Sequence, residues 1–101
     1  MVINDDVKHV IEGTAFLSLV TVNPDGTPHP IITGKAEVSG NNVVFGIYKM
    51  ETTQKNLTSD NKVWVVAATL DGGPKGYRLA GTAKAEGKQV IFTPDKAELL
   101  L

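Results

Sequence analysis

A group of polar side chains lies at the point where a short apolar segment, residues 43–48, meets a predicted helix. The group combines two hydroxyls, an amide and two ammonium groups, supplied by Thr52, Thr53, Gln54, Lys49 and Lys55. The first backbone NH groups of a helix have no partner within the helix, and they favour an anion. The spacing therefore predicts a phosphate site, although the same residue types also serve as ordinary helix caps.

The other residues that could do chemistry are isolated in the sequence. His29 lies between two prolines beside a turn, which indicates a solvated loop residue rather than a general base. His9 has no second histidine or cysteine at metal-ligand spacing, and the chain has no cysteine at all, so no metal site is expected. Trp64 is interpreted as a core residue and Arg78 as a solvated one.

The composition argues against several classes of function. The chain has 101 residues with 42% hydrophobic content, which suits a single domain over residues 1–101. Lys plus Arg (10) nearly balances Asp plus Glu (11), so no basic field attracts nucleic acid or an anionic membrane. No apolar segment approaches the roughly 20 residues that span a bilayer, and the N-terminus lacks the pattern of a signal peptide. We therefore expect a soluble, cytoplasmic protein without a nucleic-acid or membrane partner.

Two short helices and six strands are predicted to position the polar group. The first helix begins at a cap supplied by Asn4 or Asp5 and ends at Gly13, with its apolar residues on one face. The second helix lies near residues 53–59. The strands are predicted at 15–22, 27–38, 43–48, 62–70, 77–86 and 89–93.

Turn and breaker residues order these strands. Residues 23–26, with the sequence NPDG, suit a tight reversal, so the first two strands should form a hairpin. Pro28 and Pro30 cannot donate to a ladder, which predicts an edge position or an irregular start for the second strand. Pro94 is expected to stop the last strand. Six short strands with brief helices predict a mainly β fold, a small antiparallel barrel whose closure removes exposed edges.

Five short motifs follow one another along the chain. They are FLSLVT at 16–21, NPDG at 23–26, PHP at 28–30, KMETTQKNL at 49–57 and YRLAGTA at 77–83. Their order resembles the pyridoxamine 5'-phosphate oxidase-like split barrels, and most of all the small bacterial FMN-binding proteins in that group. The resemblance extends from about residue 15 to residue 86 and rests on the order of the motifs, since none is specific by itself.

The resemblance implies a six-stranded antiparallel split barrel with short flanking helices, a homodimer, and FMN held in a cleft between the subunits. It also implies a flavin-dependent oxidoreductase of unknown substrate, in which the flavin carries the redox chemistry. The residues that would line the flavin and its phosphate are Thr33, Gly34, Lys35, Ile47, Tyr48, Thr52, Thr53 and Gln54, with Lys49 or Lys55 supplying positive charge.

Two departures from the family pattern affect this site. Thr52 stands where many members have a basic residue, so the phosphate would depend on hydroxyls and backbone NH groups, with weaker affinity. Only Gly87 and Lys88 separate two strands between which members commonly insert a helix. Part of the dimer surface or of the substrate pocket is therefore expected to be missing.

Two other functions remain open at this point, because one fold hosts many functions. A flavin carrier or electron-transfer module would shield the ring, for instance with Leu99, Leu100 and Leu101, and would not turn over reduced nicotinamide. A barrel for single-stranded nucleic acid would need a basic groove lined with aromatic residues. The net charge of -1 and the 6% aromatic content argue against that third function.

Overall fold

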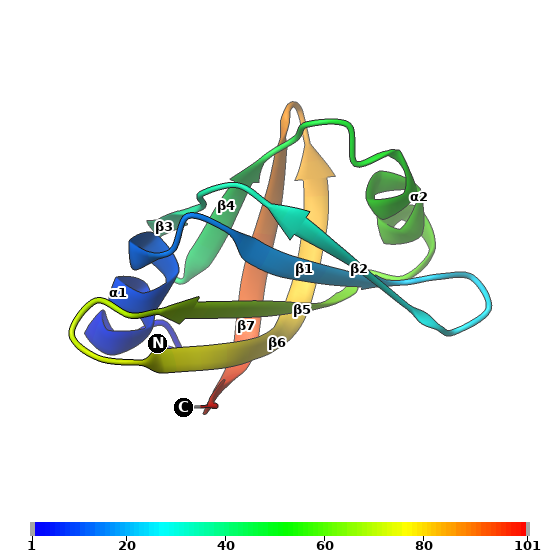
Figure 1. The fold of residues 1–101 in the computed structure, drawn as a ribbon. Coiled ribbons are helices and arrows are strands. Elements are labelled where there is room, and N and C mark those ends of the chain that lie inside the picture. Colours follow the sequence, from blue (N-terminus) through cyan, green and yellow to red (C-terminus); the bar gives the residue numbers. More distant parts are fainter. Residues whose placement is uncertain (1, 101) are drawn as a thin grey trace.

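A computed structural model describes residues 2–100 of the chain (Figure 1). Its elements are α1 (Asp5–Gly13), β1 (Leu17–Val22), β2 (Pro28–Thr33), β3 (Glu37–Ser39), β4 (Asn42–Gly46), α2 (Glu51–Ser59), β5 (Lys62–Thr69), β6 (Lys75–Glu86) and β7 (Gln89–Leu99). The strands form one antiparallel sheet in the order β2-β1-β5-β6-β7-β4-β3. The predicted mainly antiparallel β fold is confirmed. Neither helix of the described chain is long and apolar enough to cross a membrane.

The sheet curls so that its two ends share one core (Figure 1). Leu19 of β1, Val65 of β5 and Phe45 of β4 are all fully buried in a single cluster, although β1 and β4 lie far apart in the strand order. β2 and β3 are the two edges of this curled sheet. The result is a split barrel. Pro28 and Pro30 lie on the β2 edge, as predicted, and prolines there hinder the addition of another strand.

The predicted single strand over 27–38 is wrong, and its division raises the strand number from six to seven. β2 ends at Thr33, whereas Glu37 begins β3 at the opposite edge of the sheet. The Thr33 hydroxyl donates to the carbonyl oxygens of Leu17 at 3.3 Å and Gly34 at 3.2 Å. Ala36 is buried in the core. The chain therefore stops pairing with β1 after Thr33 and buries the Ala36 side chain in the core. It then crosses to the opposite edge of the sheet, where it forms β3.

The prediction that Pro94 ends the last strand is also wrong, because β7 continues beyond it. The pairing register shifts at this place: Gly81 pairs with Pro94, but Ala80 pairs with Lys96. Such a β-bulge leaves an extra residue in one strand and accommodates a proline that has no NH to donate. Glycine is required opposite the bulge, since a Cβ at Gly81 would lie 2.1 Å from the carbonyl oxygen of Thr93.

Helix α1 covers one end of the barrel, and its predicted boundaries are confirmed. The Asn4 side chain accepts the NH of Val7 at 2.9 Å, and the predicted apolar face is buried. Glu12, near the end of the helix, accepts the backbone NH of Val38 at 3.3 Å. A carboxylate on α1 thus satisfies an amide of the short edge strand β3.

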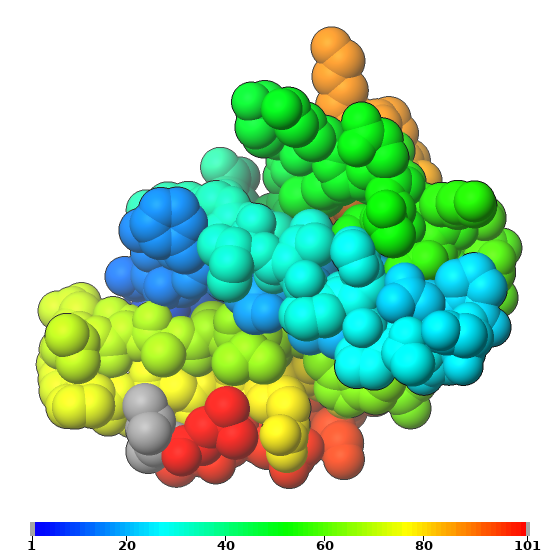
Figure 2. Space-filling view, turned by 45° about the vertical axis from the view of Figure 1, so that its right-hand side comes forward, coloured from blue at the N-terminus to red at the C-terminus, as the bar shows by residue number. Residues whose placement is uncertain are grey.

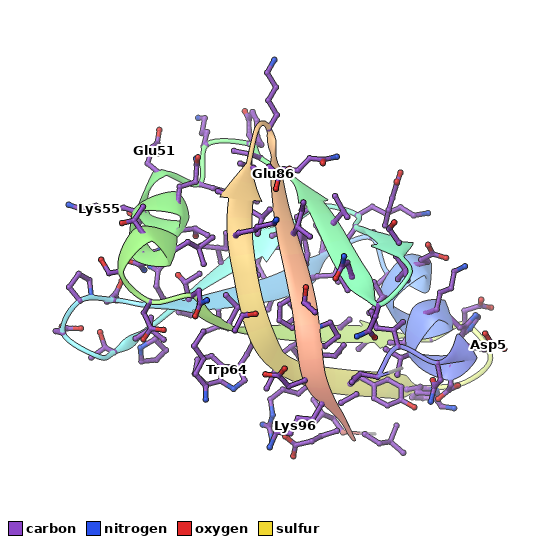
Figure 3. All side chains as sticks on the ribbon, turned by 180° about the vertical axis from the view of Figure 1, so that it is seen from behind. Asp5, Glu51, Lys55, Trp64, Glu86 and Lys96 are labelled. Carbon is purple, nitrogen blue, oxygen red and sulfur yellow. The ribbon has the colours of Figure 1, made fainter. Side chains whose placement is uncertain are left out.

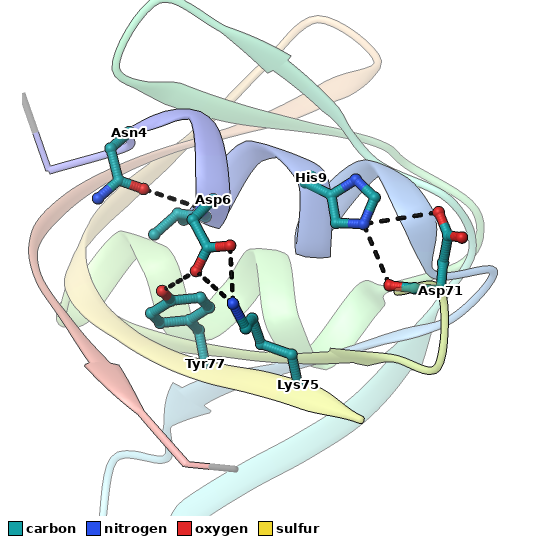
Figure 4. A network of polar contacts seen from close by, with 7 residues as sticks. Asn4, Asp6, His9, Asp71, Lys75 and Tyr77 are labelled. Atoms are coloured by element: carbon teal, nitrogen blue, oxygen red, sulfur yellow. Dashed lines mark hydrogen bonds and ion pairs between the residues drawn. The ribbon is translucent and has the colours of Figure 1, made fainter. Parts of the chain in front are cut away.

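A polar network joins α1 to the turn after β5 and to the start of β6 (Figure 4). The Asp6 carboxylate accepts hydrogen bonds from the Tyr77 hydroxyl and, at 2.9 Å, from the Lys75 ammonium group. His9 lies farther along the helix, with Nε2 3.2 Å from the carbonyl oxygen of Asp71. The Tyr77 hydroxyl and then the Lys75 ammonium group lower the pKa of Asp6 below its ordinary value.

We expect Asp6→Asn to lower the melting temperature near neutral pH and to make the protein less sensitive to acid. The folded-state pKa of Asp6 is lowered, so its stabilising effect is present above the unfolded pKa of about 4 and is lost as the pH falls through the folded pKa. Thermal unfolding as a function of pH would measure this. Asp5→Asn is the matched control, because it removes the same charge from the same helical turn. Parallel curves for the two variants would contradict the prediction.

Candidate functional site

A cleft opens at the split of the barrel, between the end of β2 and the segment that follows β4. It has a volume of about 220 Å³ and is lined by Ile31, Ile32, Thr33, Gly34, Gly46, Tyr48 and Met50. Figure 2 shows this face, with the cyan segment of β2 below the green segment that leads into α2. Three predicted site residues, Thr33, Gly34 and Tyr48, lie in the lining. β4 ends at Gly46 rather than at the predicted Tyr48, so Tyr48 belongs to the connection.

The connection from β4 to α2 adopts an unusual backbone conformation. Lys49 has φ of 67° and Met50 has φ of 29°, both in the region that side chains other than glycine rarely adopt. Met50 is the N-cap of α2 and makes no side-chain capping bond. The first amide to bond to this cap is that of Gln54, which donates to the Met50 carbonyl at 2.9 Å. The amides before it have no partner within the helix and favour an anion.

The three polar residues predicted at the start of α2 lie in different environments. Thr52 is exposed and Gln54 is half-buried. Thr53 is only 1% exposed, and its Oγ1 has no hydrogen-bond partner among the described residues. An unpaired buried hydroxyl is uncommon in folded proteins. The start of α2 therefore offers one accessible hydroxyl and one buried, unpaired hydroxyl.

The remaining predicted residues surround the cleft without lining it. Lys49 is exposed, with Nζ 5.7 Å from the centre of the Tyr48 ring. The Ile47 amide donates to the Lys88 carbonyl at 2.8 Å, which ties the connection to the turn between β6 and β7. Lys35 is exposed just after Gly34. The structure thus brings positive charge to the neighbourhood of the cleft.

Charges on α2 itself are mixed. Glu51 lies in its first turn and Lys55 farther along, and Figure 3 shows both side chains pointing away from the barrel. A carboxylate near a helix start competes with an external anion for the positive end of the helix dipole. The ionisable side chains on and just before α2 are thus Lys49, Glu51 and Lys55, and they include both signs of charge.

Sequence reasoning missed two features of this site. Met50 lines the cleft, but a left-handed backbone at methionine has no sequence signal. Asn56 is buried on the side of α2 that faces the barrel, three residues after Thr53. A helical spacing of Thr53 and Asn56, together with Met50 and Leu57, was the available indication of that buried side.

Other candidate residues do not contribute to the cleft. Trp64, predicted as a core residue, is instead half-buried on the outer face, with the Lys62 ammonium group 5.3 Å from its ring. Leu99 pairs with Tyr77 of β6 and is not among the residues that line the cleft. Leu101 lies outside the described residues. Across residues 2–100, no three possible metal ligands cluster together.

A larger hollow, of about 330 Å³, lies on the outer face beside the β-bulge. It is lined by Asn61, Lys62, Ala80, Gly81, Thr82, Asp95 and Lys96. Figure 3 labels Lys96 near the bottom of the view, beside the lower part of β7. The hollow contains none of the predicted site residues, so the smaller cleft is the better candidate despite its size.

The fold and the cleft define a split-barrel protein whose cleft adjoins an uncapped helix start. The chain belongs to the pyridoxamine 5'-phosphate oxidase family, whose model matches residues 3–93. The resemblance inferred from the five motifs is thereby confirmed. A search of curated proteins finds no match.

Solved structures of low sequence identity share the fold. HupZ from Group A Streptococcus superposes with a TM-score of 0.80 at 18% identity, over 97% of this chain and 94% of that chain. An FMN-binding protein from Syntrophomonas wolfei subsp. wolfei gives 0.76 at 15% identity, over 93% and 83%. The FAD binding protein from Mycobacterium smegmatis gives 0.72 at 17% identity, over 94% and 91%. At these identities the comparison establishes the split-barrel fold alone.

Proposed function

We propose that this protein binds FMN in the cleft between β2 and α2 and uses it as a flavin-dependent oxidoreductase. One observation carries the proposal: in a member of this family, the cleft lies directly beside a helix start that has no side-chain cap. A helix start with free amides suits a phosphate, and an adjoining cleft suits the ring of the same ligand.

The residues present fit such a ligand. Ile31, Ile32 and Met50 supply apolar contacts, and Tyr48 supplies an aromatic ring. Gly34 leaves open space where a side chain would project. FMN ends in its phosphate, so a phosphate subsite next to the cleft suits FMN better than FAD, which continues into an adenosine. When bound, the flavin supplies hydride or electron transfer, while the chain binds it, orients it and excludes water.

We further propose that the working form is a homodimer whose second copy completes the cleft. The volume of about 220 Å³ is smaller than the roughly 300–1,000 Å³ of typical cofactor sites. Ile32 is 71% exposed and Tyr48 is 79% exposed, although both line the cleft. Val20 and Val66 flank the same outer side of the sheet as Ile32. These apolar side chains support contact with a partner subunit.

The first test is a titration of the purified protein with FMN, followed by flavin fluorescence and by size-exclusion mass measurement. We expect binding by a dimer, and about tenfold or greater weakening in a Thr52→Ala/Thr53→Ala variant, equivalent to about 1.4 kcal/mol or more. Thr58→Ala is the control, because its hydroxyl bonds only to the Lys55 carbonyl of the same helix.

Two results would count against the proposal. If the wild-type protein does not bind FMN even at high concentration, the proposed flavin-binding function is wrong. If the wild type and the double variant bind FMN with equal affinity, the phosphate does not bind at the start of α2. Steady-state turnover with reduced nicotinamide separates an oxidoreductase from a flavin carrier.

A further inference from the structure

Helix α2 is attached to the barrel mainly through polar side chains. Its fully buried residues are Thr53 and Asn56, whereas Met50 and Leu57 at its borders are only partly buried against the core. Since Thr53 Oγ1 has no partner among the described residues, Asn56 carries the buried side-chain hydrogen bonds of this helix. The position of α2 therefore depends on this one amide as well as on the packing of Met50 and Leu57 against the core.

The Asn56 amide group spans two places on the first hairpin. Its Nδ2 donates to Thr21 Oγ1 at 3.1 Å and to Asn23 Oδ1 at 3.0 Å, so both of its NH bonds have partners. Asn56 is 2% exposed and Thr21 is fully buried. A satisfied polar contact in such surroundings specifies one geometry, because loss of either partner leaves a buried polar group unpaired.

Asn23 is itself held by the turn that joins β1 and β2. Its backbone NH donates to the Thr27 carbonyl at 2.8 Å, and its side-chain Nδ2 donates to Thr27 Oγ1 at 3.2 Å. Figure 1 shows α2 standing above this hairpin. A continuous polar chain thus runs from the turn, through Asn23, to Asn56 in α2.

The first hairpin and α2, which this chain joins, continue into the two walls of the cleft. β2, with Ile31 and Ile32, forms one wall, and the connection through Met50 into α2 forms the other. β4, which leads into α2, does not pair with β2. The backbone between β2 and α2 runs through β3 and β4. The Asn56 contact is therefore the direct buried polar link between the hairpin and the helix.

We propose that Asn56 is a positioning residue of the flavin site: through Thr21 and Asn23 it sets the place of the α2 start relative to β2. The inference rests on the proposed function. Displacement of α2 moves the amides that receive the phosphate and, among the ring contacts, Met50, but it leaves the contacts of Ile31 and Ile32 on β2 in place. Loss of the Asn56 bonds therefore weakens recognition of the phosphate more than recognition of the ring.

The test compares FMN with riboflavin, which carries the same ring without a phosphate. Wild type, Asn56→Leu, Asn23→Ala and the control Thr58→Ala are titrated with both flavins, and their melting temperatures are measured. Asn56→Leu keeps the approximate side-chain shape and adds no charge, but it cannot donate to the two oxygen acceptors. We expect at least a tenfold loss of FMN affinity in Asn56→Leu, a smaller loss in Asn23→Ala, and riboflavin affinity within about twofold of wild type.

The outcomes separate the inference from the proposed function. If the wild type binds neither flavin, the proposed function fails and the inference fails with it. If the wild type binds FMN and riboflavin with equal affinity, the proposal of flavin binding is supported. The inference that Asn56 positions a phosphate subsite is then wrong. Equal weakening of both flavins in the variants reveals a purely structural role and overturns the inference. If Asn56→Leu does not fold, the ratio of the two affinities in Asn23→Ala decides, because that variant retains the bond from Asn56 to Thr21.

Discussion

Gly81→Ala is expected to destabilise the protein by about 3 kcal/mol or more, a large part of the 5–15 kcal/mol that holds a small domain folded. The new methyl carbon would lie 2.1 Å from the carbonyl oxygen of Thr93 and 2.7 Å from the Cα of Pro94. Both are backbone atoms of β7, which pairs with β6 along most of its length. Relief of the clash would require the two strands to separate at the bulge.

Urea unfolding followed by tryptophan fluorescence would measure this loss, since Trp64 is the single tryptophan. Gly46→Ala is the matched control: Gly46 also lies in a strand, but a Cβ there meets nothing within 4 Å. We expect the control to unfold close to the wild-type midpoint. Equal midpoints for Gly81→Ala and the wild type would show that the strands can move apart at the bulge without cost.

Ile32→Asp is expected to convert the proposed dimer into a monomer and to weaken the proposed FMN binding by about 100-fold, or about 2.7 kcal/mol. The Ile32 side chain lines the cleft and is 71% exposed in the single chain. If a second copy covers it, a carboxylate at this position is buried at the interface without a partner. Burial of an unpaired charge is among the most costly changes at an interface.

Size-exclusion mass and FMN titration would be measured together in this variant. Leu70→Asp is the control, because Leu70 is 80% exposed and apolar but lies outside the cleft lining. We expect the control to remain dimeric and to bind FMN. If the Ile32→Asp variant stays dimeric and its FMN affinity is unchanged, the partner subunit does not cover the cleft at Ile32.

Local features of the fold could be predicted because neighbouring residues decide them. The Asn4 cap and the buried side of α1 follow from residues within one helical turn. The hairpin at 23–26 and the edge position of Pro28 and Pro30 follow from turn chemistry and from the missing proline NH. The motif order also led to the correct family.

The two largest errors in the predicted strands have one physical cause. A glycine or proline limits or widens the backbone conformations available at its own position. Whether a strand ends there depends on the pairing with a strand that is distant in the sequence. Pro94 was expected to stop a strand, yet the shifted register opposite Gly81 accommodates it. The segment after Thr33 was expected to continue a strand, yet Ala36 turns into the core and the chain crosses to the other edge.

For the candidate site, the sequence by itself determined which chemical groups are present: hydroxyls, an amide, lysines and a helix start in one short segment. The tertiary structure decided their environments, with Thr33, Gly34 and Tyr48 in the cleft, Thr52 exposed and Thr53 buried. It also decided that Met50 lines the cleft and that Asn56 joins α2 to the hairpin. Residue types follow from the sequence alone, whereas burial and distance depend on long-range contacts that form only when the whole sheet curls.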